Sequence, residues 1–214
     1  MPHPSLETIA GRLSEQLRCE QEDLCRPIVR QVTRGKPVAP AALRASLQVS
    51  RNELEQRLAK LPPDVEVDRA GNIVGLGVTL VPTSHRFQLG GQVLYTWCAF
   101  DTVLLPPSLH FEAQVQSTCP VTGQPITFVA TPEGVIRDLS PASGVMSLIV
   151  PAQRSDCSRA TFCQQSLLFQ SEQAASPFLA DHPEATLLTV EEAALVGSWV
   201  AQSRFTEKPE EKSG

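Results

Sequence analysis

The spacing of apolar residues changes near residue 80, and this change limits the folds that the chain can adopt. Before residue 80, apolar side chains recur every three or four positions, which is the period of an amphipathic helix. Beyond residue 80, short apolar runs alternate with Pro and Gly turns, as is typical of strands. The pattern predicts an α+β fold, with a helical domain over residues 1–80 and a second domain of mixed sheet and helices over residues 81–205.

Four helices followed by a hairpin are predicted in the first part of the chain. The helices are expected over residues 6–17, 24–32, 40–47 and 50–61. The fourth begins with a capping box, because Glu53 follows Ser50 at the required spacing. Two short strands, residues 65–68 and 73–78, flank a Gly/Asn turn. Helices followed by a hairpin suggest a winged-helix-like domain.

The balance of charges bears on the role of this winged-helix-like domain. It could bind DNA through Arg51, Arg57 and Lys60 of the fourth helix, or pack as a helical cap on the second domain. Residues 1–80 hold 11 basic and 10 acidic side chains, and residues 81–214 hold 7 and 13. Neither part has the strongly basic surface that neutralises phosphates. We therefore favour the cap, and nucleic acid is not an expected partner.

Residues 81–205 are predicted to be mainly sheet. Strands are expected over residues 85–89, 93–97, 111–117, 126–130, 145–150 and 166–169. One helix is predicted over residues 98–105, where Pro106 and Pro107 should end it. Another is predicted over residues 190–202, because Thr189 and Glu192 form a capping box.

From its apolar runs we expect the protein neither to be exported nor to span a membrane. Glu7, Arg12, Glu15 and Arg18 interrupt what would have to be the apolar core of a signal peptide. No apolar run approaches the roughly 18 to 20 residues that a membrane-spanning helix needs. Residues 206–214 are charged, lack apolar side chains and are predicted to be disordered. We expect a cytoplasmic protein without a membrane partner.

A possible reactive group lies at Cys98. It follows a predicted strand and stands where a helix should begin, so the helix dipole would lower the pKa of its thiol. Asp101, three residues later, would lie on the same face and could accept the thiol proton. The pair has a purely structural reading as well, since Asp is common in the first turn of a helix and free Cys is often a core residue.

A thiol hydrolase or transferase is one alternative use of Cys98. Such an enzyme needs a base, and His85, His110 and His182 are the possible ones. None of them lies in a recognisable motif. No pair of the six cysteines has CxxC spacing either, which weakens the case for a structural zinc site.

The residues around Cys98 resemble the active-site segment of organomercurial (alkylmercury) lyases. The matching stretch is residues 94–102 (LYTWCAFDT) with Pro106. Further matches follow in order along the chain: residues 71–75 (GNIVG) with Leu80, Thr83 and Phe87, residues 119–123 (CPVTG), residues 145–148 (VMSL), and residues 161–163 (TFC) before Phe169. The resemblance runs from about residue 24 to residue 203.

The resemblance implies roles for particular cysteines. Cys98 and Cys163 match the mercury-binding thiols of the family, Asp101 matches their carboxylate partner, and Cys119 matches a buried structural cysteine. Gln164 stands where many members carry a second adjacent Cys, so an accessory thiol is in doubt. Three cysteines match no family pattern and are expected to be packing or surface thiols: Cys19, Cys25 and Cys157.

The resemblance also implies a reaction. Thiolates are soft ligands suited to mercury, and two of them on R–Hg⁺ would make the carbon basic enough to take a proton from Asp101. The products would be R–H and Hg(II) held by Cys98 and Cys163, a step in mercury detoxification and resistance. No cofactor is expected. The expected partners are organomercurials, low-molecular-weight thiols and a mercuric reductase. The alternative is a cysteine-based sensor of thiophilic metals that acts as a DNA-binding regulator.

Overall fold

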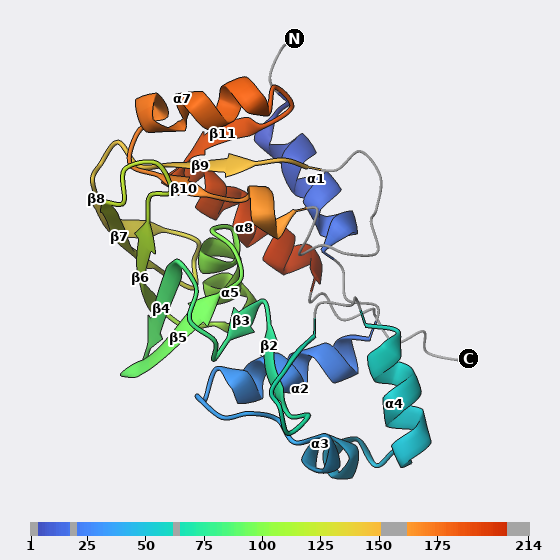
Figure 1. Ribbon diagram of the computed structural model, residues 1–214. Coiled ribbons are helices and arrows are strands. Elements are labelled where there is room, and N and C mark those ends of the chain that lie inside the picture. Colours follow the sequence, from blue (N-terminus) through green and yellow to red (C-terminus); the bar gives the residue numbers. More distant parts are fainter. Residues whose placement is uncertain (1–3, 18–20, 62–64, 151–161, 205–214) are drawn as a thin grey trace.

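Two antiparallel sheets and the helices around them form an α+β fold in this computed structural model, which describes residues 4–17, 21–61, 65–150 and 162–204 (Figure 1). The helices are α1 (Leu6–Gln16), α2 (Glu22–Val32), α3 (Pro40–Leu47), α4 (Arg51–Ala59), α5 (Asp101–Leu109), the 3₁₀ turn η1 (Cys163–Gln165), α7 (Glu172–Asp181) and α8 (Val190–Arg204). The strands are β1 (Glu66–Val67), β2 (Ile73–Leu76), β3 (Val78–Thr79), β4 (His85–Leu89), β5 (Gln92–Thr96), β6 (Ala113–Thr118), β7 (Pro125–Ala130), β8 (Ile136–Ser140), β9 (Val145–Leu148), β10 (Leu168–Phe169) and β11 (Thr186–Thr189).

The four N-terminal helices lie where the apolar spacing predicts them. In α2 the residues that set this period, Leu24, Ile28 and Val32, are all buried. The predicted cap of α4 is present, since the Glu53 N–H donates to Ser50 Oγ at 3.1 Å. A capping side chain satisfies a backbone donor that the helix itself leaves without an acceptor.

The predicted hairpin β1–β2 forms and continues into a larger sheet. Its strand order is β1-β2-β3-β5-β4-β6-β7-β8, and every neighbouring pair is antiparallel. The pairing of β3 with β5 joins strands on either side of residue 80. The boundary expected at residue 80 therefore falls inside a continuous sheet, and the division into two domains stays a prediction.

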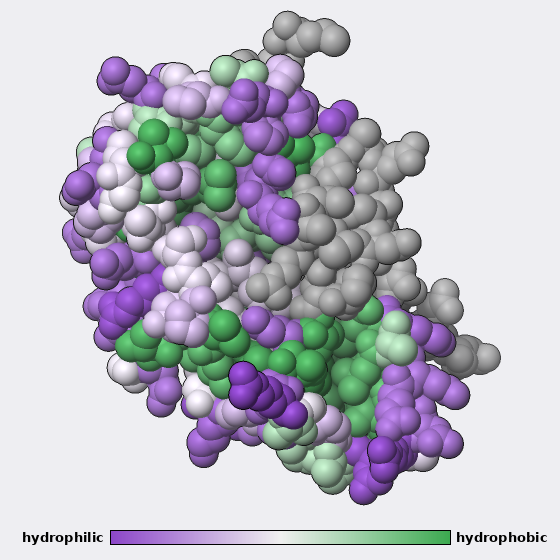
Figure 2. All heavy atoms as spheres, in the orientation of Figure 1, coloured by the Kyte–Doolittle hydropathy of each residue, from purple (hydrophilic) through white to green (hydrophobic). Residues whose placement is uncertain are grey.

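The helices of the first part occupy two places in the molecule (Figure 1). The helix α1 packs against α8, and the Ser203 hydroxyl donates to Ser14 Oγ at 2.7 Å. The other three, α2 to α4, lie together at the opposite end of the molecule, beside β2. Figure 2 shows a band of apolar residues on the surface near these helices. None of the described helices is both long enough and apolar enough to cross a membrane.

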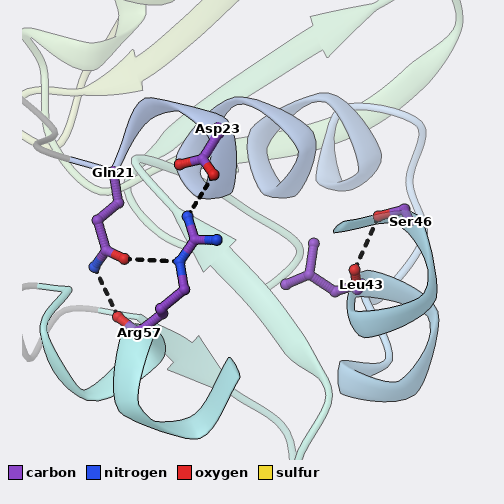
Figure 3. Close-up of polar contacts among 5 residues, drawn as sticks. All are labelled: Gln21, Asp23, Leu43, Ser46 and Arg57. Carbon is purple, nitrogen blue, oxygen red and sulfur yellow. Dashed lines mark hydrogen bonds and ion pairs between the residues drawn. The ribbon is translucent and has the colours of Figure 1, made fainter. Parts of the chain in front are cut away.

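The helices α2 and α4 are joined by polar contacts of one arginine (Figure 3). The Arg57 guanidinium donates to Asp23 Oδ2 at 2.5 Å and to Gln21 Oε1 at 3.1 Å. The Gln21 side-chain amide in turn donates to the Arg57 carbonyl at 2.8 Å. In α3, the Ser46 hydroxyl donates to the Leu43 carbonyl at 2.9 Å. The Arg57 side chain of α4 thus holds α4 against the start of α2.

The prediction that Pro106 and Pro107 end the helix after Cys98 is wrong. The helix α5 begins at Asp101 and continues through both prolines to Leu109; it ends at His110, whose φ of 58° is left-handed. Proline removes one backbone hydrogen bond, and packing can compensate for it. Here α5 packs closely on α8, where a Cβ at Gly197 would lie 2.9 Å from the Val103 carbonyl oxygen.

The remaining elements combine confirmed and missed predictions. The six expected strands are present as β4, β5, β6, β7, β9 and β10. The helix α8 has its predicted capping box, with the Thr189 N–H on Glu192 Oε2 at 2.9 Å and the Glu192 N–H on Thr189 Oγ1 at 3.1 Å. The elements β8, β11 and α7 were not predicted. β11 pairs with β9 in the second sheet, β10-β9-β11, and residues 206–214 lie outside the described residues.

Candidate active site

The first thiol of the site, Cys98, lies in the turn between β5 and α5. The Thr96 hydroxyl donates to the Cys98 carbonyl at 2.9 Å, and the Trp97 N–H donates to the Gly77 carbonyl at 2.9 Å. Both bonds fix the backbone on the way into the turn. The Cys98 side chain points into the core and has no exposed surface. The helix predicted to begin at Cys98 begins three residues later, at Asp101.

The second thiol, Cys163, lies at the start of η1, far from Cys98 in the sequence. It is buried, with 8% of its surface exposed. Just beyond η1 the chain enters β10, which pairs with β9. The two thiol segments meet through an aromatic contact as well, because the rings of Phe100 and Phe162 pack edge to face with centroids 5.7 Å apart. This contact packs the residue that precedes Cys163 against the residue that precedes Asp101.

The three residues predicted to form the site lie together. One ligand atom each from Cys98, Asp101 and Cys163 lies within 4.8 Å of the other two, which is close enough to hold one metal ion. The Cys98 thiol donates to Asp101 Oδ2 at 3.3 Å. Asp101 is partly exposed, whereas both thiols are buried. The site thus combines two soft sulfur ligands with one carboxylate that can accept or release a proton.

The expectation that the helix dipole lowers the pKa of Cys98 is wrong. Burial raises the pKa of the Cys98 thiol well above its ordinary value, and the hydrogen bond with Cys163 and the negative charge of Asp101 raise it further. The Asp101 backbone N–H opposes this shift. Desolvation prevails because the sulfur is fully enclosed, so Cys98 is protonated in the free protein.

Gly77 lies beside the carboxylate and was not predicted as part of the site. Its φ is +78°, and a Cβ built there would lie 3.5 Å from Asp101 Oδ1. Glycine lets the backbone adopt this left-handed conformation and pass close to the carboxylate. The turn between β2 and β3 therefore forms one wall next to Asp101.

Ser166 is a second residue that sequence reasoning missed. Its side chain is fully buried, and its Oγ accepts a hydrogen bond from the Phe100 N–H at 3.0 Å. Its carbonyl accepts another from the Ala99 N–H at 3.1 Å. The contact joins segments far apart in the chain, and no local pattern around Ser166 marks it, so the sequence carried no signal for it.

The three histidines considered as bases lie outside this cluster. His85 is buried in the large sheet, where its Nδ1 lies 2.9 Å from Ser117 Oγ, and burial lowers its pKa to about 4. His110 terminates α5, and His182 follows α7, stacked on Phe178. Within the described part of the chain, the residues grouped with the two thiols therefore include no imidazole.

The other cysteines differ in their states. Cys119 is a free, fully buried thiol, as expected of a structural residue. Cys25 is buried on α2 and disulfide-bonded, so the expectation of a free thiol there is wrong. Cys19 and Cys157 lie outside the described residues.

Comparison with known proteins finds matches over most of the chain. The family model described as alkylmercury lyase matches residues 78–202. The alkylmercury lyase of Pseudomonas putida is 38% identical over 174 residues, which cover 81% of each chain. The alkylmercury lyase of Staphylococcus epidermidis is 36% identical over 176 residues, 82% of this chain and 80% of its own.

A solved structure shares the fold as well. The crystal structure of the mercury-bound form of MerB2 superposes with a TM-score of 0.78, at 24% identity, and covers 93% of this chain and 98% of its own. At that identity the superposition establishes the fold alone, and the family rests on the sequence matches. The chain belongs to the alkylmercury lyase family.

Proposed function

We propose that this protein is an organomercurial lyase, which cleaves the carbon–mercury bond of R–Hg⁺ by protonolysis to give R–H and Hg(II). Membership of the alkylmercury lyase family makes it an enzyme. One observation carries the assignment of the site: Cys98, Asp101 and Cys163 lie close enough together to contact one mercury atom. The mercury enters as part of the substrate.

Capture of the substrate is the first step that we propose. The Cys98 sulfur binds the mercury of R–Hg⁺, and its proton passes to Asp101. The hydrogen bond from Cys98 to Asp101 Oδ2, at 3.3 Å, supports this transfer because it already joins the donor to the acceptor. The raised pKa of Cys98 supports it too, since the thiol keeps this proton until the metal displaces it.

Cleavage is the second step. Cys163 joins Cys98 on the mercury and releases its own proton to solvent. Two sulfur ligands push electron density toward the carbon, and Asp101 gives it the proton taken from Cys98. The carbon–mercury bond breaks, a carbon–hydrogen bond forms, and Hg(II) stays on the two sulfurs. The overall change is R–Hg⁺ plus two thiols to R–H, a mercury dithiolate and one proton.

Release of Hg(II) requires competing thiols. We propose low-molecular-weight thiols as the direct acceptors and a mercuric reductase as a possible recipient, in a cytoplasmic setting. No organic cofactor or resident metal is needed, since the substrate supplies the metal and the two thiols and Asp101 supply the ligands and the proton. The thiols reset the site for the next turnover.

A cysteine-based regulator that binds DNA is the competing function. It would use a winged-helix-like arrangement of α2 to α4 and the β1–β2 hairpin, which we propose serves here as a scaffold. Two basic side chains of α4 already pair with carboxylates, Arg57 with Asp23 and Arg51 with Glu55. Their charges are thereby partly neutralised, which disfavours binding to phosphates.

Headspace gas analysis separates an enzyme from a sensor. Purified protein is incubated with methylmercury and excess thiol, and methane is measured by gas chromatography. We expect methane in stoichiometric excess over protein, because a lyase turns over. A sensor binds the mercury and leaves the bond intact, so the absence of methane would reject the proposed function.

A further inference from the structure

Ser166 connects the two thiol segments of the site. Its N–H donates to the Cys163 carbonyl at 3.3 Å, which holds it against η1. Its carbonyl and its Oγ accept hydrogen bonds from Ala99 and Phe100, at 3.1 Å and 3.0 Å. These bonds leave one residue bound to the backbone of the Cys163 segment and to the turn between Cys98 and Asp101.

The turn depends on these acceptors because α5 has no cap of its own. The residue before the helix is Phe100, whose side chain makes no capping bond. A backbone N–H at a helix start lacks an acceptor within the helix, and leaving it buried without one is unfavourable. Ser166 supplies acceptors from another part of the chain. The start of α5 is thus fixed by the Cys163 segment.

Ser166 is itself held on both sides by one residue of β9. The Ser147 hydroxyl donates to the Gln165 carbonyl at 2.9 Å and accepts from the Leu167 N–H at 3.2 Å. The Ser147 N–H donates to the Leu167 carbonyl at 2.9 Å. Because the neighbours of Ser166 are tied to a strand, it has little freedom to follow a shift of the turn. A continuous set of bonds runs from β9 through Ser166 to the Cys98 turn.

We propose that Ser166 is a positioning residue for the lyase reaction, which sets the spacing between Cys98 and Cys163. The proposal rests on the proposed function. Capture of R–Hg⁺ by one sulfur does not depend on this spacing, whereas cleavage requires both sulfurs on one mercury atom and Asp101 near the carbon. Small misplacements of reacting groups have large effects on rate. Loss of the Ser166 hydroxyl therefore affects cleavage more than capture.

Replacement of the hydroxyl tests this role. In Ser166→Ala, only Oγ is lost and the backbone bond to Ala99 remains. We expect kcat for methylmercury to fall by about tenfold or more, while KM changes by less than about threefold because capture by the Cys98 sulfur alone does not depend on its distance from Cys163. The X-ray absorption of bound Hg(II) should show two sulfur ligands in the wild type and a reduced sulfur count in the variant. Ser166→Thr, which keeps a hydroxyl, should restore most of kcat.

Ser117→Ala is the matched control. Ser117 is an equally buried serine, but its hydroxyl contacts His85 in the large sheet and not the site. It should lose stability and keep kcat and the two-sulfur signature. The proposal is overturned if Ser166→Ala keeps kcat within twofold of the wild type, or keeps both sulfurs on mercury. Wild-type protein that makes no methane would instead reject the proposed function.

Hydrogen exchange on the unaltered protein provides a second measurement, which holds even if Ser166→Ala does not fold. The Ala99 and Phe100 amides should exchange slowly in the free protein, because Ser166 accepts from both. Binding of Hg(II) should slow them further by joining the two segments. Exchange as fast as that of exposed loop amides would overturn the proposal.

Discussion

The Cys98 thiol carries its proton in the free protein because burial raises its pKa well above the ordinary value. A reactive cysteine is more often activated by losing that proton early. In the mechanism that we propose, this proton is needed later, as the one that the carbon receives. A fully buried thiol bonded to Asp101 stores it next to its first acceptor.

Replacing Asp101 by Asn should separate binding from cleavage. The amide keeps the size of the side chain but cannot carry a proton, so kcat should fall by roughly 10²- to 10⁴-fold. The two sulfurs remain, and Hg(II) affinity measured by competition with a small thiol should change little. Asp181→Asn, at an exposed carboxylate, is the control and should behave like the wild type. Near-normal turnover by Asp101→Asn would remove Asp101 from the mechanism.

Replacing Cys163 by Ser should abolish turnover, because a hydroxyl is a poor ligand for a soft metal. One sulfur would remain to capture R–Hg⁺, so mass spectrometry should find the intact organomercurial bound to the variant. Cys119→Ser is the matched change at a free buried thiol away from the cluster. It should lower stability and leave turnover of the folded protein intact. An active Cys163→Ser enzyme contradicts the two-thiolate mechanism.

His85 should make stability fall in mild acid. Its pKa is lowered to about 4 in the folded protein, while the unfolded chain binds a proton near pH 6.5. Below pH 6.5 the unfolded state binds more protons than the folded state. The stability that depends on a neutral His85 is therefore fully present above that pH and is lost as the pH falls toward 4. Between pH 7 and 5 the loss should be roughly 2 kcal/mol.

Urea unfolding at the two pH values measures this loss. The free energy of unfolding of the wild type should fall more than that of His85→Gln, which cannot titrate. His110→Gln, at an exposed position, should follow the wild type. Equal pH dependence in the wild type and in His85→Gln would assign the acid sensitivity to other groups.

At the scale of elements, the contact between α5 and α8 sets the direction of the helix that carries Asp101. A Cβ at Gly197 would lie 2.9 Å from the Val103 oxygen and 3.1 Å from its carbonyl carbon, and backbone atoms cannot move aside cheaply. Gly197→Ala should therefore destabilise the fold by about 1–3 kcal/mol, measured as a lower thermal midpoint. Gly11→Ala is the control in α1, where the new methyl meets open space. It should stabilise the helix by about 0.5–1 kcal/mol.

Local patterns predicted the elements whose causes are local. The period of Leu24, Ile28 and Val32 predicted α2, and the capping box of Thr189 and Glu192 predicted the start of α8. The passage of α5 through Pro106 and Pro107 depends on packing against α8, which local sequence does not contain. The strand β11 owes its pairing to β9, another distant partner.

Some features of the site could likewise be predicted from local sequence, and others could not. The i, i+3 spacing of Cys98 and Asp101 could be seen in the sequence, and Cys163 came from the family resemblance. The raised pKa of Cys98 could not be foreseen, because it follows from complete burial in the tertiary structure. The contact of Ser166 with the Cys98 turn is also a long-range one. Tertiary context therefore raises the pKa of Cys98 and brings Cys163 beside it.

At the scale of the whole molecule, the two ends of the chain support the same core. The first helix, α1, packs on the last, α8, and α8 packs on α5, which begins at the site. The large sheet meanwhile runs through residue 80 and joins β3 to β5. A substitution that destabilises α1 should thus lower the stability of the whole core, and the effect should not be confined to the N-terminal part.

Leu13→Ala tests this coupling, because Leu13 is a fully buried residue of α1. The cavity should cost about 2–5 kcal/mol, and the loss should lower the midpoint of one cooperative unfolding transition. Circular dichroism and the fluorescence of Trp199 on α8, recorded in a Trp97→Phe background, should change together. Leu195→Ala, on an exposed part of α8, should cost less than about 0.5 kcal/mol. If α1 were instead an independent appendage, Leu13→Ala would produce an early change in circular dichroism while Trp199 kept its wild-type midpoint.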